Sequence, residues 1–308
     1  MIVLRGPWQT WPVVTGPTSM AIGVMDGVHI GHRALLSRLD RGAEATVLTF
    51  EPHPVEVLRP GTPPRLITSL EERLALLESA GIDCVGVLDL SEIKELSPED
   101  FVKGILVDRM RLAHLVVGED FRFGKDRTGD VALLERMGTE LGFVVETTPL
   151  VTRDEIPVSS SRIRELIESG DVSGASELLD SWFTITNVVV DGDKRGRQIG
   201  FPTANLRPPA RKVIPARGVY ACFATVAGEV HDAAVNVGVR PTFGGGELLV
   251  EAFILDFDED IYGNDLSIEF VQYLRPELEF SGVEDLVARM EQDVVDTRAS
   301  LDQVRSGI

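Results

Sequence analysis

The 308-residue sequence has few cysteines, few aromatic residues and few basic residues. Its 2 cysteines, Cys84 and Cys222, lie far apart in separate apolar runs, which excludes a disulfide-stapled scaffold and a Cys-x-x-Cys zinc site. The 30 Lys and Arg residues against 49 Asp and Glu give a formal net charge of −19, which argues against nonspecific nucleic-acid binding because such binding needs a basic face. No apolar run approaches the length of a membrane span or a signal peptide. We therefore expect a cytoplasmic protein with buried thiols that binds neither nucleic acid nor membrane.

Hydrophobic residues make up 44% of the 308 positions, which is enough for a full core and for two domains. Up to about residue 148, apolar strand-like runs alternate with helical patterns, which predicts a parallel sheet flanked by helices. Ser69-x-x-Glu72 predicts the start of a helix over 70–80, and Ser97-Pro98 the start of one over 101–110. The expected strands are 21–22, 45–50, 84–88, 115–118 and 143–147.

The pattern changes near Trp182, after two short helices predicted over 161–169 and 172–179. From there to Tyr273, runs rich in Val, Ile and Phe alternate with turn sequences, which predicts an antiparallel barrel or sandwich. Ser281-x-x-Glu284 predicts the cap of a final helix that ends at about Leu301. The chain is thus expected to be an α/β protein with domains over 1–182 and 183–308. The predicted turns of the second domain are 191–193, 227–228, 244–246 and 263–264.

Two histidines three residues apart, His29 and His32, lie where the first of these strands turns into a helix. Residues at this spacing share a helix face, and a helix start offers free N–H groups and a positive dipole end. Three glycines of this segment, Gly23, Gly27 and Gly31, would let a phosphate approach the backbone closely. The segment therefore suits a nucleotide triphosphate, whose developing charge two imidazoles would stabilise. Taken alone, it is equally typical of a capped helix with exposed histidines.

Two further segments of the first domain follow predicted strand ends. Phe50 to Pro54 reads F-E-P-H-P, and the 118–124 loop contains Asp120, Phe121 and Phe123. Such loops would enclose a flat ring system, with a phenylalanine stacking on it and Asp120 accepting hydrogen bonds. The alternative is that at least one phenylalanine belongs to the core.

Three serines followed by arginines begin the predicted helix over 161–169. Hydroxyl groups at a helix start are common caps, and a cap with nearby arginines also suits a phosphate group. The residues are Ser159, Ser160, Ser161, Arg162 and Arg164.

The second domain contains a basic, glycine-punctuated loop that ends in hydroxyl and amide side chains. Its glycines would admit phosphates, while Thr203 and Asn205 would coordinate a hydrated Mg²⁺; an ordinary surface loop is the alternative. Glu251 lies on a predicted strand in an otherwise apolar row with Leu249 and Phe253. Partial desolvation would make it more basic, which makes it a candidate general base, unless it reaches solvent at a strand end.

These segments together resemble the prokaryotic bifunctional riboflavin kinase and FMN adenylyltransferase (FAD synthetase) family, from about Thr15 to Leu301. Further matching blocks are Gly218-Val219-Tyr220, 236–243 (N-V-G-V-R-P-T-F) and Val250-Glu251. The resemblance implies a Rossmann-like nucleotidyltransferase domain followed by a β-barrel kinase domain with a terminal helix. It also implies two ATP-dependent reactions: phosphorylation of riboflavin to FMN in the second domain, and adenylylation of FMN to FAD and pyrophosphate in the first.

The resemblance further implies roles for individual residues. Glu251 would take the proton from the ribityl 5′-hydroxyl, and His29 and His32 would steady the triphosphate. Kinase ATP would be bound by Gly196, Arg197, Gly200, Phe201, Pro202, Thr203 and Asn205, the last two also holding Mg²⁺. ATP phosphates in the first domain would meet Gly23, Asp26, Gly27, Gly31, Ser159, Ser160, Ser161, Arg162 and Arg164, and FMN would meet Phe50, Pro52, His53, Asp120, Phe121 and Phe123.

Three positions depart from the family pattern: Met25 stands in place of phenylalanine, Ser161 in place of threonine, and Phe253 in place of a common histidine. Methionine fills an apolar slot adaptably and serine keeps the hydroxyl, so we expect both reactions to survive. We expect Phe253 to pack against apolar neighbours and leave Glu251 competent. The competing hypotheses are that only one half is active, or that the chain is a non-catalytic flavin-binding or flavin-sensing protein. A monomer and a homo-oligomer both remain open.

Overall fold

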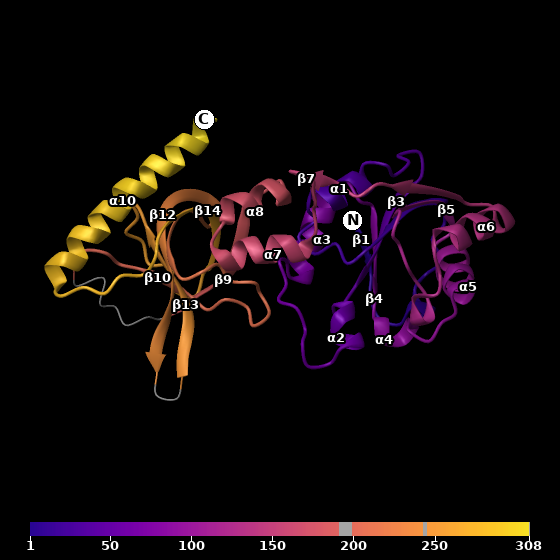
Figure 1. Cartoon of the computed structure of the whole chain (residues 1–308), viewed down its shortest axis with the longest axis horizontal. Coiled ribbons are helices and arrows are strands. Elements are labelled where there is room, and N and C mark those ends of the chain that lie inside the picture. The colour runs from indigo at the N-terminus through magenta and orange to yellow at the C-terminus, as the bar shows by residue number, and fades with distance from the viewer. Residues whose placement is uncertain (191–198, 243–244, 308) are drawn as a thin grey trace. The chain divides into compact units, whose positions relative to one another are not determined.

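The computed structural model describes residues 1–190, 199–242 and 245–307, with backbone only for 240–242 and 245–247. The chain divides into two compact units, Met1–Ser160 and Ser161–Ile308 (Figure 1). This division lies earlier than the boundary predicted near residue 182. The reason is that helix α8 (Val172–Leu179) packs against strands of the barrel, and the Ala216 N–H donates to the Ile167 carbonyl of helix α7 (Ser160–Ser169) at 3.3 Å.

The first unit is built on a six-stranded sheet in the order β1-β4-β3-β2-β5-β6. All of its strand pairs are parallel, which confirms the predicted parallel sheet. Strand β1 was not predicted, because three residues are too few to show a period. From β2 the chain continues to β3 on one side, while β5 lies on the other, and ligands of open α/β sheets bind at such a switch point. The strands are β1 (Ile2–Leu4), β2 (Thr18–Ile22), β3 (Glu44–Phe50), β4 (Cys84–Leu88), β5 (Leu112–Gly118) and β6 (Val144–Thr148).

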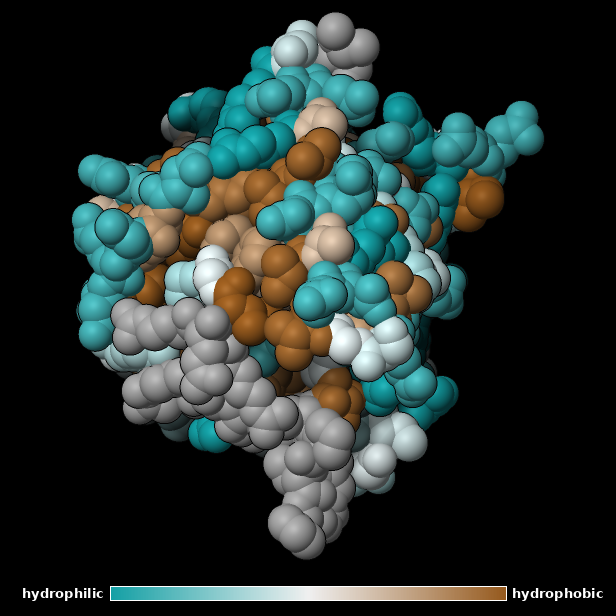
Figure 2. Space-filling model, turned by 90° about the vertical axis from the view of Figure 1, so that its left-hand side faces the viewer, coloured by the Kyte–Doolittle hydropathy of each residue, from teal (hydrophilic) through white to brown (hydrophobic). Residues whose placement is uncertain are grey.

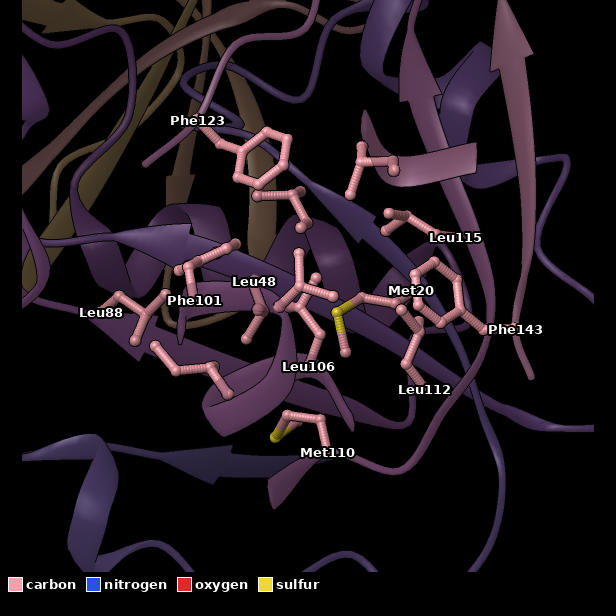
Figure 3. Close-up of a cluster of buried hydrophobic side chains, with 14 of the residues drawn as sticks. Met20, Leu48, Leu88, Phe101, Leu106, Met110, Leu112, Leu115, Phe123 and Phe143 are labelled. Atoms are coloured by element: carbon pink, nitrogen blue, oxygen red, sulfur yellow. The ribbon is translucent and has the colours of Figure 1, made fainter. Parts of the chain in front are cut away.

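Two hydrophobic clusters cover the two faces of this sheet, since successive side chains of a strand point to opposite faces. Met20 and Ile22 belong to one cluster, drawn in Figure 3, and Ala21 belongs to the other. The second cluster includes Leu36 of helix α1 and Leu77 of helix α3. The helices of the unit are α1 (Ile30–Leu36), α2 (Pro54–Leu58), α3 (Leu70–Ser79), α4 (Leu90–Ile93), α5 (Pro98–Asp100), η2 (Phe101–Arg109) and α6 (Val131–Leu141), with single turns η1 (Trp8–Thr10) and η3 (Lys125–Arg127) and a small hairpin of β7 (Thr152–Arg153) and β8 (Ile156–Pro157).

The helix starts predicted at Ser69 and Ser97 are confirmed. The Ser69 hydroxyl accepts from the Glu72 N–H at 3.1 Å, and the Glu72 carboxylate accepts from the Ser69 N–H at 2.7 Å, which is the expected capping box. Helix η2 follows the short helix that Ser97 caps and covers the span predicted as 101–110. Its hydrogen bonds are those of a π-helix, as in the 3.0 Å bond from Met110 N–H to the Ile105 carbonyl.

The second unit is a closed antiparallel barrel in the order β10-β13-β12-β11-β14-β9, so the sandwich alternative does not apply. The predicted turns at 227–228 and 263–264 join its strands; those at 191–193 and 244–246 fall wholly or partly outside the described residues. Helix α10 packs against β11, β12 and β14. The elements are β9 (Phe183–Val190), β10 (Ala204–Leu206), β11 (Gly218–Val226), β12 (Glu229–Thr242), β13 (Gly245–Ile254), β14 (Asp265–Arg275) and α10 (Val283–Arg305).

The predicted cap of the final helix was wrong. The N-cap is Gly282, without a side-chain hydrogen bond, because the Ser281 hydroxyl donates to the Asp285 carboxylate instead of accepting from the helix backbone. The helix also runs to Arg305, one turn beyond the predicted end at Leu301. Across the described ranges, we found no helix with the combined length and apolar character that a membrane crossing requires.

Candidate active sites

The loop after β2 has an unusual backbone. Met25 (φ 55°), Gly27 (φ 83°) and Val28 (φ 40°) all adopt positive φ, which costs roughly 1–3 kcal/mol for each residue other than glycine. The loop is held because the Met25 and Val28 side chains are completely buried in the core beneath α1 and α3. Met25 thus fills an apolar slot, as predicted. A strained loop fixed by core packing at the carboxyl end of a strand is a preorganised site for a ligand.

Asp26 anchors this loop from within. Its buried carboxylate accepts hydrogen bonds from the backbone N–H of Ile67 (3.0 Å) and of Thr68 (2.9 Å) and from the Thr68 hydroxyl (3.1 Å). The same hydroxyl accepts from the Gly27 N–H at 3.0 Å, and the Ser160 hydroxyl donates to the Asp26 carbonyl at 3.0 Å. The carboxylate therefore fixes the shape of the loop, and Ser160 of the predicted serine segment reaches the same loop.

The histidine pair forms a compact unit at the start of α1. His29 is the N-cap residue, and its Nδ1 accepts from the His32 N–H at 3.3 Å. The two rings stack with centroids 3.7 Å apart and planes 18° from parallel. A Cβ atom at Gly31 would lie 3.1 Å from the His29 ring, so glycine permits the ring to fold over the helix start.

Burial favours the neutral form of His32. The pKa of His32 lies well below its ordinary value of 6.5, first because the ring is desolvated and then because His29 and the Arg73 guanidinium are close. The buried Nδ1 of His32 has no hydrogen-bond partner among the described residues.

The segment after β3 is mainly organised by His53. Its Nδ1 accepts from the Val55 N–H at 3.2 Å, and the Glu56 carboxylate accepts from the His53 N–H at 2.9 Å, so the imidazole caps α2. His53 is buried, whereas Phe50 and Pro52 are half-buried. The side chains that present a surface at this strand end are therefore Phe50 and Pro52.

The loop after β5 divides its aromatic residues between core and surface. Phe123 is buried against Phe101, with ring centroids 5.8 Å apart, and lies in the cluster of Figure 3. Phe121 is half-buried and stacks on Phe123 at 5.6 Å, and Asp120 is exposed. Phe123 thus fits the core alternative, while Phe121 presents an aromatic face. Ser161, Arg162 and Arg164 belong to the second unit, so their part in a phosphate site stays a prediction.

Arg73 of α3 was not predicted as a site residue. It is completely buried, and its Nη1 donates to the Thr49 hydroxyl (3.2 Å) and to the Phe50 carbonyl (3.0 Å). The signal in the sequence is an arginine inside a leucine stripe: Arg73 lies three residues after Leu70 and four before Leu77, on the face that packs against the sheet.

The second unit places Glu251 between two asparagines. Asn205 of β10 and Asn236 of β12 pair with Glu251 of β13 from opposite sides, so the three residues form a row across three strands. Glu251 lies well inside its strand and is half-buried, in contrast to the strand-end alternative. Asn236 was not predicted as a site residue, although it begins one of the matching blocks.

This row lines a cavity of about 360 Å³. Arg275 and Glu277 and the apolar side chains of Leu278, Phe280, Leu286 and Met290 form much of the remaining wall. None of them was predicted, because they follow the barrel motifs in sequence; Leu286 and Met290 reach the cavity through the packing of α10. Figure 2 shows an apolar area framed by hydrophilic residues on the side of the molecule where α10 begins. Such a cavity suits a flat, largely apolar ring system with a few polar groups.

A second cavity of about 230 Å³ lies on the other face of the same strands. It is lined by Ala204 and Ala252, the neighbours of Asn205 and Glu251, because alternate residues of a strand face opposite sides. Residues 257–262 also line this cavity. Thr203 lines both cavities, and the Asn205 amide nitrogen donates to the Thr203 carbonyl at 3.3 Å.

Other predicted residues surround this junction. Phe201 and Phe253 pack with ring centroids 5.0 Å apart, which confirms that Phe253 has an apolar neighbour. Pro202 lines the 230 Å³ cavity, and Gly200 adopts a positive φ of 88°. Gly196 and Arg197 lie outside the described residues.

A buried ion pair fixes α10 beside the larger cavity. The Asp293 carboxylate accepts from Arg275 Nε at 2.8 Å and from Arg289 Nε at 3.0 Å. Asp293 is 5% exposed, so this pair links β14 to α10 with little access for water. The wall of the cavity therefore depends on this link.

The parallel-sheet unit, with paired histidines at its switch point, and the barrel, with a carboxylate lining one of two cavities that meet at Thr203, define a two-domain transferase. Two family models match in that order: FAD synthetase over residues 13–162 and riboflavin kinase over residues 179–301. Together with the relatives described next, these matches show that the chain belongs to the bifunctional riboflavin kinase/FMN adenylyltransferase family.

Relatives with that name cover nearly the whole chain. The protein of Pseudomonas fluorescens is 39% identical over 97% of both chains, that of Listeria monocytogenes is 38% identical over 91% of both, and that of Escherichia coli K12 is 36% identical over 91% of both. A solved structure titled "Macrolide-efflux Protein from Streptococcus pneumoniae" is also similar, with 29% identity and a TM-score of 0.89 over 97% of this chain and 99% of that one. The macrolide efflux named there refers to the Streptococcus pneumoniae protein.

Proposed function

We propose that the chain phosphorylates riboflavin to FMN in the barrel and adenylylates FMN to FAD in the parallel-sheet unit, with ATP as the co-substrate of both reactions. The observation that carries the kinase assignment is the position of Thr203 between two cavities on opposite faces of one sheet region. A flavin ring fits the larger, partly apolar cavity, and the nucleotide fits the smaller one. The two substrates then meet at Thr203.

Glu251 is the proposed general base of the kinase. It lines the flavin cavity in a row with Asn205 and Asn236, whose amide groups can orient the ribityl chain by hydrogen bonds. Glu251 takes the proton from the 5′-hydroxyl as that oxygen bonds to the γ-phosphorus of ATP and the bond to ADP breaks. Positioning and charge neutralisation supply most of the catalysis in such a transfer.

Thr203 and Asn205 are the proposed Mg²⁺ ligands. A hydroxyl and a carboxamide oxygen are hard oxygen donors of the kind that Mg²⁺ prefers. Thr203 and Asn205 are two residues apart in sequence, and Thr203 directly precedes β10. Within the ranges that the structure describes, no group of three or more His, Cys, Asp or Glu residues can hold a metal ion. A site with few protein ligands fits an ion that retains waters and binds substrate phosphates. The ion would neutralise charge on the phosphates.

The adenylyltransferase site is proposed at the carboxyl ends of β2, β3 and β5. His29 and His32 contact the ATP phosphates together with the glycines of the strained loop. Ser159 adds a hydroxyl donor, while Ser160 supports the loop by donating to the Asp26 carbonyl. Phe50, Pro52, Asp120 and Phe121 face the flavin. A phosphate oxygen of FMN bonds to the α-phosphorus, and the bond to pyrophosphate breaks. FMN phosphate is already ionised at neutral pH, so no general base is needed.

The barrel thus produces the substrate of the first unit. The expected partners are the small molecules ATP, riboflavin and FMN. We propose the cytoplasm as the compartment, since Cys84 and Cys222 are buried, free thiols.

One incubation tests both assignments. The protein is mixed with riboflavin, ATP and Mg²⁺, and the flavins are separated and quantified over time. FAD as the product supports both activities, FMN without FAD leaves a kinase only, and FAD formed only from added FMN leaves an adenylyltransferase only. Bound but unchanged riboflavin and FMN would leave a flavin-binding protein and contradict the proposal.

A paired substitution separates the two sites. The variant His29→Ala/His32→Ala should make FMN at the normal rate and no FAD, because the barrel is a separate compact unit. Loss of both products in a folded variant would contradict the two-site assignment.

A further inference from the structure

Arg73 lies beneath the proposed adenylyltransferase site and is connected by hydrogen bonds to both of its main loops. Its Nη1 donates to the Phe50 carbonyl, where the flavin-facing segment begins, and to the Thr49 hydroxyl. That hydroxyl in turn donates to the Val24 carbonyl at 2.8 Å, in the strained loop before the histidines. The chain of hydrogen bonds from Arg73 therefore joins the loop after β2 to the segment after β3.

Burying the charged side chain of Arg73 at this place costs free energy. The side chain is completely buried, and its Nε and Nη2 have no hydrogen-bond partner among the described residues. Its Nη2 lies 3.8 Å from a carboxylate oxygen of Glu51, too far for a direct hydrogen bond. Buried donors without a partner cost about 1–3 kcal/mol each, and more when charged. A leucine would fill the same stripe of α3 without this cost, so stability alone does not account for the arginine.

The surroundings of Arg73 connect it to the histidines. Asp26, Glu51 and Glu71 act on it as neighbouring negative charges, while burial lowers its pKa. His29 and Arg73 are the two charged or titratable groups that lower the pKa of His32 in addition to desolvation. Arg73 is therefore close enough to the histidine pair to influence its protonation.

We propose that Arg73 is a positioning residue for adenylyl transfer, which fixes the histidine loop and the flavin-facing segment in one geometry. This inference rests on the adenylyltransferase function proposed above. Arg73 does not itself touch the substrates, because no part of its side chain reaches the surface.

The test compares Arg73→Met, Arg73→Lys and the control Arg38→Met in the full chain. Arg38 is an arginine of the same unit whose side chain is 61% exposed and pairs with Glu146 at 3.4 Å. For each protein we would measure the kcat and KM of FAD formation from FMN and ATP, the rate of riboflavin phosphorylation, and the pKa of His32 by NMR titration.

For Arg73→Met we expect kcat for FAD to fall by about 10- to 100-fold, as expected when reacting groups shift by about 1 Å. Riboflavin phosphorylation should stay normal, and the pKa of His32 should rise because a nearby positive charge is gone. Arg73→Lys should keep the low pKa of His32 but recover only part of kcat, since an ammonium group cannot reproduce the fork to Thr49 and Phe50. Arg38→Met should match the unchanged protein in every measurement.

A normal kcat for FAD in Arg73→Met, or an unchanged pKa of His32, would overturn the inference while the adenylyltransferase function stood. Absence of FAD formation in the unchanged protein would instead overturn the function, and the inference with it. If Arg73→Met fails to fold, Thr49→Val decides, because it removes the shared hydroxyl with little change in volume. The inference then requires a lower kcat for FAD, and a normal kcat would overturn it.

Discussion

Replacing Glu251 by Gln removes the proposed general base and little else. Glutamine has the size of glutamate, and an amide at this position would join the row formed by Asn205 and Asn236 on the neighbouring strands. The cavity of about 360 Å³ should keep its shape, since its other walls come from β11, α10 and the segment after β14. We therefore expect riboflavin to bind with a nearly normal KM.

Removal of the general base should lower the kcat of FMN formation. A positioned general base contributes a factor of about 10²–10⁴, and each tenfold change corresponds to about 1.4 kcal/mol of activation free energy. The expected increase in the barrier is therefore about 3–5 kcal/mol. Binding by the asparagines and charge neutralisation at Thr203 remain, so a residual rate is expected.

The assay is FMN formation from riboflavin and ATP at saturating concentrations. Glu229→Gln is the control, because Glu229 is an exposed residue at the start of β12 in the same barrel. FAD formation from added FMN reports on the other unit of the same Glu251→Gln preparation. A near-normal kcat for FMN in Glu251→Gln would refute the role of general base. A raised KM with an unchanged kcat would show that the carboxylate only binds the substrate.

Three further expectations follow from the contacts. Gly31→Ala should lower FAD formation about tenfold and spare FMN formation, because a Cβ atom 3.1 Å from the His29 ring displaces it; a product assay with both substrates checks this. Asp293→Asn should cost about 2–3 kcal/mol of unfolding free energy in the barrel, since it leaves the Arg275 guanidinium without its charge partner, and should weaken riboflavin binding; urea unfolding and flavin titration measure both. His32 binds its proton less tightly in the folded state than in the unfolded chain, so the first unit should lose stability as pH falls below about 6.5, by up to about 1.4 kcal/mol per pH unit, until the lowered folded pKa is reached. Denaturant titrations of His32→Gln should show a correspondingly smaller loss over that range.

Local patterns were enough to predict most of the elements. The Ser69 capping box and the alternating strands were read correctly because they depend on residues close in sequence. Ser281 shows the limit of the same reasoning: its hydroxyl bonds to the Asp285 carboxylate, and Gly282 is the N-cap residue. The domain boundary near residue 182 stays a prediction; the compact units divide earlier, at Ser160, because α8, which follows the parallel sheet in sequence, packs with the barrel.

The sequence by itself determined the fold class, the order of the two catalytic domains and the residue types that carry their chemistry. Periodicity, caps and glycine spacing are properties of neighbouring residues, and the matching blocks contain His29, His32, Thr203 and Glu251. These features predict a histidine-based nucleotide site and a carboxylate-based kinase site before any packing is known.

Only the tertiary structure decided which residues surround those motifs. Asn236 comes beside Glu251 through strand register, α10 completes a cavity wall from more than 30 residues further along the chain, and Phe123 turns into the core while Phe121 faces outward. Arg73 in α3 donates to Phe50 and Thr49 at the end of β3, 23 and 24 positions away in sequence, and Thr49 links it to Val24 in the loop after β2. Contacts over such separations arise from the packing of helices against a sheet, and no local pattern in the sequence encodes them.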